Sequence, residues 1–279
     1  MNEMMKFVNN KNIFLKSKHY QLAFLLTQKL LKYHKSKIVA VGVFGSIATS
    51  TNTYYSDVDL IIITKKKSKD KFFILQNGKT RILPEIGKDI KISLFFKTKR
   101  ESMNILRSIN DLFWPVKSAM LLNVFPIYDP QDMFAEFRAV FKKFKGKCHD
   151  KKFQRLAGQW LSVAYEFLGK IHKQNLNKKQ ALIYTKEFIF CIANAYKAIN
   201  KDFFKNIYNF IDETKELSIK HGGVTNLMEL LLNLRDISSI RRNAMKLWKD
   251  TNYYMQSHCV QMVSYSRSQL NDVLKELLS

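Results

Sequence analysis

The chain has 279 residues, of which 46% are hydrophobic and 25% charged, and this composition excludes a disordered or fibrous protein. No apolar run reaches the roughly 18 residues of a membrane span, the first 14 residues lack the features of a signal peptide, and the three cysteines lie far apart. We therefore expect a cytoplasmic protein with no membrane partner. The net charge of +24 suggests a nucleic-acid binder, but 38 of the 47 basic residues are Lys, a pattern that AT-biased codon usage also produces.

The first half of the chain alternates between helical and extended patterns. Leucines from Leu22 to Leu31 fall on one helical face, which predicts an amphipathic helix over 18–34. Residues 101–124 also have a helical pattern, in which Pro115 must start, kink or break a helix. Short runs rich in β-branched and aromatic residues predict strands over 38–44, 58–64, 72–75, the region around Gly78, 90–96 and 125–128.

The second half shows helical periodicity throughout. Predicted helices cover 150–174, 178–200, 201–218, 224–234 and 236–278, the last of which is long enough for two. The change of character falls at the basic, glycine-containing stretch 142–147. We therefore predict an α+β fold, with a small mixed-sheet domain over 1–145 followed by an all-α helical bundle over 146–279.

Two short motifs carry the chemistry of the first half. Gly45-Ser46 ends the first predicted strand, and Asp57-Val58-Asp59 leads directly into the second. Side chains two residues apart lie on the same face of a strand, so both carboxylates point one way while Val58 points into the core. Two neighbouring carboxylates favour a cation between them, and Mg²⁺ prefers one or two carboxylates together with substrate phosphates. Gly45 allows the backbone to approach a phosphate, which Ser46 and the next backbone N–H groups can cradle.

These motifs resemble the hG[GS]…DhDh signature of the DNA-polymerase-β-like nucleotidyltransferase superfamily. The chain is similar in layout to stand-alone nucleotidyltransferases with a C-terminal helical domain, a class that includes aminoglycoside and lincosamide nucleotidyltransferases. The stretch 122–130, which ends in Pro126-Ile127-Tyr128-Asp129-Pro130, looks like their edge strand, and the stretch from Asn200 to Lys205 is weakly similar to an N-G-x-Y-F…K stretch of their helical domains. The resemblance implies that Ser46 contacts the β/γ-phosphates, that Asp57 and Asp59 hold two Mg²⁺ ions, and that the helical domain binds the acceptor.

The resemblance also implies a third carboxylate, for which the sequence offers more than one candidate. Alignment by hydrophobic pattern places Lys91 or Ser93 at its position on the 90–96 strand. Asp89 shares their face and reaches the metal site if the strand register lies one pair earlier. Glu85, a carboxylate of the helical domain, or no third acid at all are the alternatives, and we take Asp89 as the catalytic and metal-binding candidate.

The remaining candidates are basic residues and two Cys-His pairs. Lys65-Lys66-Lys67 is either a solvated end of a strand or an attractor of polyanions, and Lys205 is a candidate contact for the triphosphate. Cys148-His149 and His258-Cys259 do not match a zinc module, because adjacent residues on a helix diverge by about 100°.

The predicted function is transfer of a nucleoside monophosphate from a magnesium-bound nucleoside triphosphate to an acceptor hydroxyl, with release of pyrophosphate. The residues do not specify the base, and adenylate is assumed because ATP is abundant. The acceptor is a small molecule or an RNA such as a tRNA. Residues 1–147 carry a net charge of +16 and residues 148–279 one of +8, which favours an anionic nucleotide and disfavours a polycationic acceptor. The alternative function is a catalytically inactive nucleotide- or RNA-binding protein of the same fold.

Overall fold

The computed structural model describes residues 17–48, 56–67, 90, 92–204, 210–215 and 224–263. The chain divides into two compact units. Unit 1 comprises Met1–Arg107 and Lys117–Phe144, and unit 2 comprises Ser108–Val116 and Lys145–Ser279. The assignment of Ser108–Val116 to the helical unit is a feature that the sequence patterns did not indicate.

Unit 1 contains a mixed sheet, as the sequence predicted, and the described residues supply four of its strands. The strand order is β3-β2-β1-β4. Strand β1 pairs antiparallel with both β2 and β4, and β2 pairs parallel with β3. The strands are β1 (Ile38–Phe44), β2 (Val58–Thr64), β3 (Ile92–Thr98) and β4 (Phe125–Tyr128). The strand expected over 90–96 thus runs two residues later, and the strands expected over 72–75 and around Gly78 lie outside the described residues.

One face of this sheet is covered by helix α2 (Lys18–His34), whose bounds match the prediction. The Ser17 side chain caps the helix by accepting a hydrogen bond from the Tyr20 backbone N–H. The leucine stripe of α2 packs against alternate residues of β1 and β2 in one buried cluster, which includes Leu22, Leu26, Leu30, Val41, Val43, Leu60 and Ile62. The residues on one face of the helix, which recur about every 3.6 positions, therefore pack against strand residues that recur every two positions.

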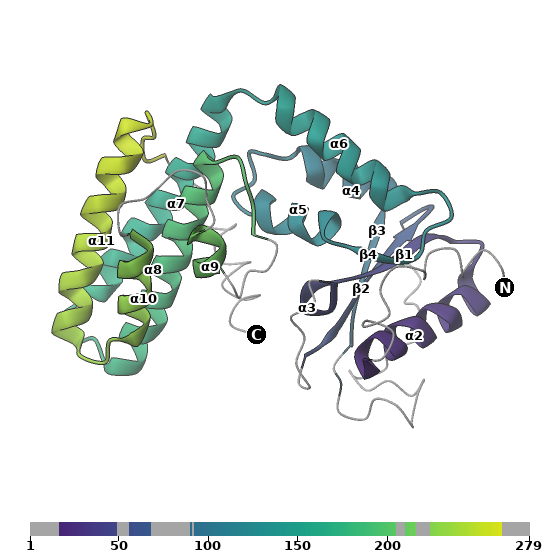
Figure 1. Ribbon diagram of the computed structural model, residues 1–279, viewed down its shortest axis with the longest axis horizontal. Coiled ribbons are helices and arrows are strands. Elements are labelled where there is room, and N and C mark those ends of the chain that lie inside the picture. The colour runs from purple at the N-terminus through teal and green to yellow at the C-terminus, as the bar shows by residue number, and fades with distance from the viewer. Residues whose placement is uncertain are drawn as a thin grey trace. The chain divides into compact units, whose positions relative to one another are not determined.

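The other face is covered by α4 (Lys99–Arg107), α5 (Trp114–Leu122) and α6 (Met133–Lys147), as Figure 1 shows. Pro115 lies in the first turn of α5, where its missing N–H has no helical partner to lose. Gly42 gives these helices room, because a Cβ atom there would lie 2.2 Å from Cγ1 of Val124 and 3.1 Å from the Phe134 ring. Val124 and Phe134 therefore pack directly against the backbone of β1 at Gly42.

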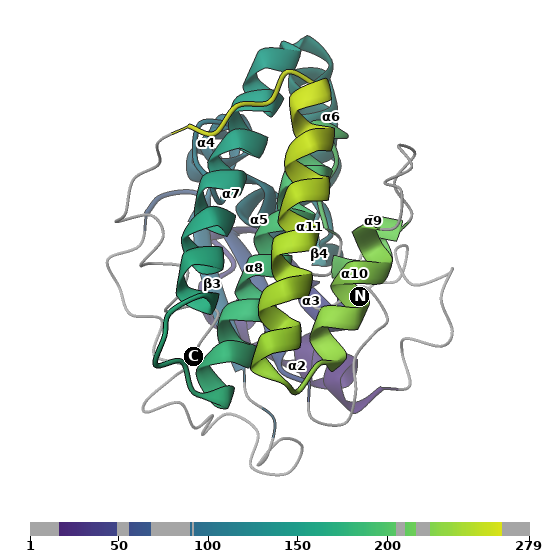
Figure 2. The same cartoon turned by 90° about the vertical axis from the view of Figure 1, so that its left-hand side faces the viewer.

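The described secondary-structure elements of unit 2 are all helices. The helices are α7 (Asp150–Ile171), α8 (Lys178–Ile199), α9 (Phe210–Lys215), α10 (Val224–Asn233) and α11 (Ile237–Ser257). Figure 2 shows α7, α8 and α11 running side by side, in agreement with their contacts. Aromatic rings from the 108–116 segment enter this core, where Phe113 packs edge-on to Trp160 and Trp114 packs edge-on to Phe203.

Helix α11 ends earlier than the sequence indicated. Residues 260–263 leave the helix and lie along α7, where the Ser162 hydroxyl donates a hydrogen bond of 2.9 Å to the Val263 carbonyl. A Cβ atom on Gly158 would lie 2.0 Å from the Gln261 carbonyl oxygen, so only glycine leaves space for this segment. The remainder of the long helix predicted to residue 278 lies outside the described residues.

No described helix combines the length and the hydropathy that a membrane span requires. All three cysteines, Cys148, Cys191 and Cys259, are free thiols.

Candidate nucleotide-binding site

The two sequence motifs meet at one end of the sheet. Strand β1 ends at Phe44, which pairs with Asp59 of the antiparallel β2, and the short helix α3 (Gly45–Ala48) follows at once. Gly45 has a φ of +70°, a left-handed conformation that side chains with a Cβ rarely adopt. A Cβ on Gly45 would also lie 2.8 Å from Oδ2 of Asp59. The turn therefore favours glycine, and any side chain at this position would also have to displace the Asp59 carboxylate.

The two carboxylates lie at the start of β2. Asp57 immediately precedes the strand and Asp59 is its second residue, and both are partly exposed. Val58 between them is fully buried in the α2-side core, whereas Ile61 and Ile63 belong to the cluster on the opposite face. Because side chains alternate along a strand, Asp57 and Asp59 lie on the same face, as the sequence predicted.

The neighbouring strand places a hydroxyl next to these acids. In the parallel β2–β3 register, Asp59 pairs with Ser93 and Val58 pairs with Ile92. Ser93 is thus the β3 residue beside Asp59, in agreement with the simple alignment by hydrophobic pattern. Asp89 and Glu85 lie outside the described residues, so the role of a third acid stays a prediction.

The donor set of this site suits a hard cation. Carboxylate oxygens are ligands that Mg²⁺ prefers, and it completes its coordination with water and substrate phosphates. Two carboxylates on one side of a rigid strand, with the glycine of an adjacent turn against one of them, therefore fit Mg²⁺ bound together with a triphosphate. Among the described residues, no group of three or more His, Cys, Asp or Glu side chains could hold a metal ion.

The lysine run that follows β2 lies away from the acids. Lys65 comes six residues after Asp59 along an extended strand, which separates them by about 20 Å. The Lys65 backbone N–H donates to the Lys37 carbonyl, and the Thr64 hydroxyl donates to the Lys66 carbonyl. Lys65, Lys66 and Lys67 therefore belong to the opposite end of the sheet from the two carboxylates.

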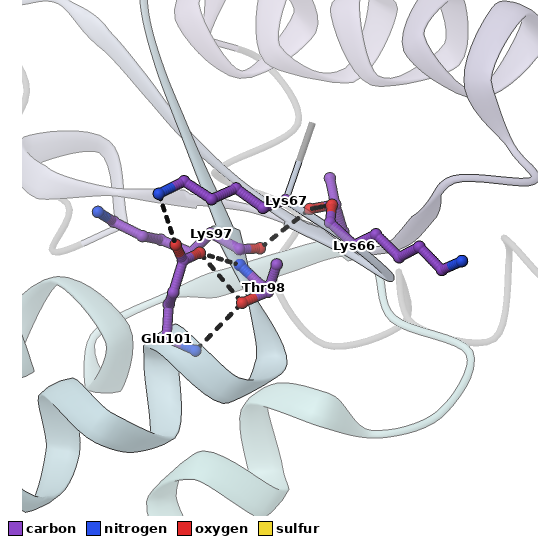
Figure 3. A network of polar contacts seen from close by, with 6 residues as sticks. Lys66, Lys67, Lys97, Thr98 and Glu101 are labelled. Atoms are coloured by element: carbon purple, nitrogen blue, oxygen red, sulfur yellow. Dashed lines mark hydrogen bonds and ion pairs between the residues drawn. The ribbon is translucent and has the colours of Figure 1, made fainter. Parts of the chain in front are cut away.

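A capping box organises this far end, and Figure 3 shows it at close range. The Glu101 carboxylate accepts hydrogen bonds from the backbone N–H and the hydroxyl of Thr98, and the Glu101 N–H donates to the Thr98 hydroxyl. The backbone hydrogen bond from Thr98 is the main cause that lowers the pKa of Glu101. The Thr-x-x-Glu spacing is a sequence signal for a helix start, and it places the start of α4 before the helical pattern predicted from residue 101.

Asp129, in the stretch that resembles an edge strand, has a structural role. Its buried carboxylate accepts hydrogen bonds from the backbone N–H groups of Met133 and Phe134, at 2.7 and 3.0 Å, and so caps α6. Burial raises the pKa of Asp129, although these two hydrogen bonds act in the opposite direction. An Asp a few residues before a helical pattern is the signal by which such a cap is found from sequence.

In unit 2, the stretch around Asn200 forms the end of α8. Lys201 has a φ of +53°, its N–H donates to the Ala198 carbonyl, and the Asp202 N–H donates to the Lys197 carbonyl. This pattern is a Schellman motif, in which glycine is the usual left-handed residue. Lys201 occupies the glycine position of the N-G-x-Y-F stretch that it resembles, and Lys205 lies outside the described residues.

A comparison with protein families points to the same class. Residues 27–111 match the family model described as polymerase beta, nucleotidyltransferase, and this range contains both Gly45-Ser46 and Asp57-Val58-Asp59. This part of the chain is therefore a nucleotidyltransferase domain of the polymerase-β-like superfamily.

A solved structure and the curated proteins complete the comparison. The crystal structure of a nucleotidyltransferase-like protein from Exiguobacterium sibiricum 255-15 is similar over 84% of this chain and 74% of its own, with 12% sequence identity and a TM-score of 0.45. No curated protein matches the sequence.

Proposed function

We propose that this protein transfers a nucleoside monophosphate from a magnesium-bound nucleoside triphosphate to an acceptor hydroxyl and releases pyrophosphate. The nucleotidyltransferase domain over residues 27–111 supports the general reaction. Adenylate is our choice of transferred group because ATP is the abundant triphosphate.

The observation that carries the proposal is the contact between Gly45 and Asp59. The register of β1 and β2 brings the Gly45-Ser46 turn against the second carboxylate of the Asp57-Val58-Asp59 motif, so that a Cβ on Gly45 would have to displace this carboxylate. Residues separated by more than ten positions thus lie together at one edge of the sheet, which would bind phosphate and metal in this proposal.

Each residue has a defined task in this proposal. Asp57 and Asp59 would hold Mg²⁺, which when bound neutralises phosphate charge and polarises the phosphate under attack. Ser46 would donate its hydroxyl to the β/γ-phosphates and fix the leaving group in line with the acceptor. Asp89 would accept the proton of the acceptor hydroxyl. Lys205 would contact the triphosphate.

The decisive experiment uses nucleoside triphosphates labelled at the α-phosphate, Mg²⁺ and a cell extract as the source of acceptor. We expect a labelled product that disappears with Asp57→Asn or Asp59→Asn, whereas a matched variant of an exposed acid, Asp212→Asn, retains it. The size of the product separates a small-molecule acceptor from RNA. Absence of both labelled product and pyrophosphate with all four triphosphates would contradict the proposal.

The pairing of Ser93 with Asp59 favours one competing function. Because a hydroxyl rather than a carboxylate lies beside Asp59 on β3, a protein that binds nucleotide without transferring it is the second candidate. Asp89→Asn separates the two functions, since it lowers turnover by orders of magnitude and leaves triphosphate affinity nearly intact if Asp89 is the base. Triphosphate binding that needs Asp57 and Asp59, with no transfer in any extract, would establish the second candidate.

A further inference from the structure

The end of the sheet opposite the two carboxylates carries a cluster of exposed lysines. We define the lysine end as Lys35, Lys37, Lys65, Lys66 and Lys67, all of which are exposed. Two chain segments form it, the turn between α2 and β1 and the segment that follows β2, and the backbone hydrogen bond of 3.0 Å from Lys65 to Lys37 joins them. The arrangement is therefore set by sheet pairing, and the positive charge gathers at a fixed place on unit 1.

An acidic side chain of the described residues pairs with one lysine of this end. Oε1 of Glu101 lies 3.9 Å from Nζ of Lys67, whose side chain is 85% exposed. Glu136 lies nearby along α6 but pairs with Lys99, at 2.7 Å. Figure 3 shows the Lys66 ammonium pointing away from the Glu101 carboxylate, so the positive charge extends to both sides of that ion pair.

An exposed aromatic ring lies beside the lysine end in the sequence. Tyr33, in the last turn of α2, is 69% exposed, and Nζ of Lys32 lies 5.7 Å from its ring centroid. Tyr33 precedes Lys35 by two residues, so the ring and the turn lysines leave the same end of the helix. Exposed aromatic rings next to lysines are the combination with which proteins bind single-stranded nucleic acids, since bases stack on rings and phosphates contact lysines.

We propose that the lysine end of unit 1 binds single-stranded nucleic acid, with Tyr33 stacking on a base and the lysines contacting consecutive phosphates. The exposed ring favours a nucleic acid over an acidic polypeptide, which has no base to stack. Lysines act as point charges on phosphates and do not read sequence, so we expect little sequence preference. This binding does not depend on nucleotidyl transfer, and failure of one proposal leaves the other standing.

The test is fluorescence anisotropy with labelled 20-nucleotide U-only RNA and T-only DNA at several salt concentrations. The variant is Lys65→Gln with Lys66→Gln and Lys67→Gln, and the matched control is Lys173→Gln with Lys178→Gln and Lys179→Gln, three exposed lysines of unit 2. Each lost phosphate contact lowers the salt slope by about 0.7, so we expect the first variant to lose about 2 from the slope and at least tenfold in affinity. The control removes the same charge and changes affinity less than threefold.

Further measurements keep the outcome decisive. Tyr33→Ala should weaken binding about fivefold or more, the loss of one stacked base. Where the triple variant unfolds at a lower temperature than the wild type, Lys35→Gln with Lys37→Gln tests the same surface. RNA and DNA binding equally indicates recognition through phosphates and bases, whereas a preference for RNA adds contact with the 2′-hydroxyl. Equal losses in the two lysine triples, no binding by the wild type, or equal competition by polyglutamate would each overturn the proposal.

Discussion

The turn at the candidate site in unit 1 and the helix ends of unit 2 differ in how they use left-handed backbone positions. Unit 1 also has a non-glycine residue of this kind away from the candidate site, Asp132 at φ +51° before α6. In unit 1 the turn after β1 has glycine at φ +70°, and a carboxylate fills the space that a side chain would need. In unit 2 the ends of α8 and α11 place Lys201 and Cys259 at φ +53° and +58°. Strain of this kind costs about 1–2 kcal/mol per residue. The helical unit tolerates this cost at simple helix ends, whereas the turn at the candidate site has glycine.

The end of α11 shows why the helical unit tolerates it. The Val260 N–H donates to the Met255 carbonyl and the Cys259 N–H donates to the Gln256 carbonyl, which is the same Schellman pattern as at α8. Met255 and Val260 are both buried, as the hydrophobic contact of this motif requires. These hydrogen bonds and contacts offset the strain at Cys259.

Gly45→Ala is the variant with the largest expected effect. Its Cβ would press on Oδ2 of Asp59 at 2.8 Å, so we expect at least a hundredfold loss of labelled product, together with about 1–2 kcal/mol of stability. Labelling rate and urea unfolding measure the two effects. The matched control is Gly146→Ala in α6, which meets nothing within 4 Å and should gain about 0.5–1 kcal/mol. Unchanged labelling by Gly45→Ala would remove the close approach from the proposed site.

Gly42→Ala tests whether a glycine of unit 1 serves packing alone. Its Cβ would overlap the Val124 side chain and crowd Phe134, so we expect a loss of about 2–3 kcal/mol in the free energy of unfolding. Gly42 lies in the middle of β1, away from the carboxylates, and the variant that remains folded should retain its labelling rate per folded molecule. A selective loss of labelling in fully folded protein would show that the two glycines are not separable.

Lys201→Gly tests the cost that unit 2 tolerates. Relief of left-handed strain should raise the free energy of unfolding by about 1 kcal/mol relative to Lys201→Ala. Both variants lose the ion pair with Asp150, so their difference isolates the backbone. Cys259→Gly against Cys259→Ala repeats the comparison at α11. Equal stabilities within each pair, measured by urea unfolding, would mean that these helix ends carry no strain.

Glu101→Gln has the smallest expected effect and concerns the capping box of unit 1. Because the native pKa of Glu101 is lowered, its ionised form contributes stability above the unfolded pKa, and this contribution disappears as the pH falls through the native pKa. We expect a loss of about 0.5 kcal/mol at pH 7, small because the side chain is 38% exposed, and little difference at pH 3. Urea unfolding at both pH values measures it, and a difference that grows on acidification would contradict this sign.

The sequence predicted the elements whose patterns are local. Strands 38–44, 58–64 and 125–128 and helix 18–34 agree with the structure because runs of β-branched residues and a leucine stripe report burial directly. The motifs at Gly45 and Asp59 were placed in one site from their residue types and spacing, and the antiparallel pairing of β1 and β2 brings them together.

The features that the sequence did not indicate depend on partners far along the chain. Phe113 and Trp114 belong to unit 2 because they pack on Trp160 and Phe203, and a short aromatic segment has no periodicity that reveals this. Helix α11 stops at Ser257 although the helical pattern continues, because the following residues pack on Gly158. The β3 register also depends on its pairing with β2, which determined the neighbour of Asp59.

The strap of residues 260–263 along α7 bears on the order in which the chain folds during synthesis. Ser162 and Val263 are 101 positions apart, so the first long helix of unit 2 stays without this partner until the ribosome has made nearly all of that unit. The four described strands of the unit 1 sheet are complete by Tyr128. Domains generally fold in the order of their synthesis. The sheet edge that carries Gly45 and Asp59 is therefore complete while Gly158 still lacks the segment that packs on it, and we expect a nascent chain stalled at this stage to hold a folded sheet and an incomplete helical unit.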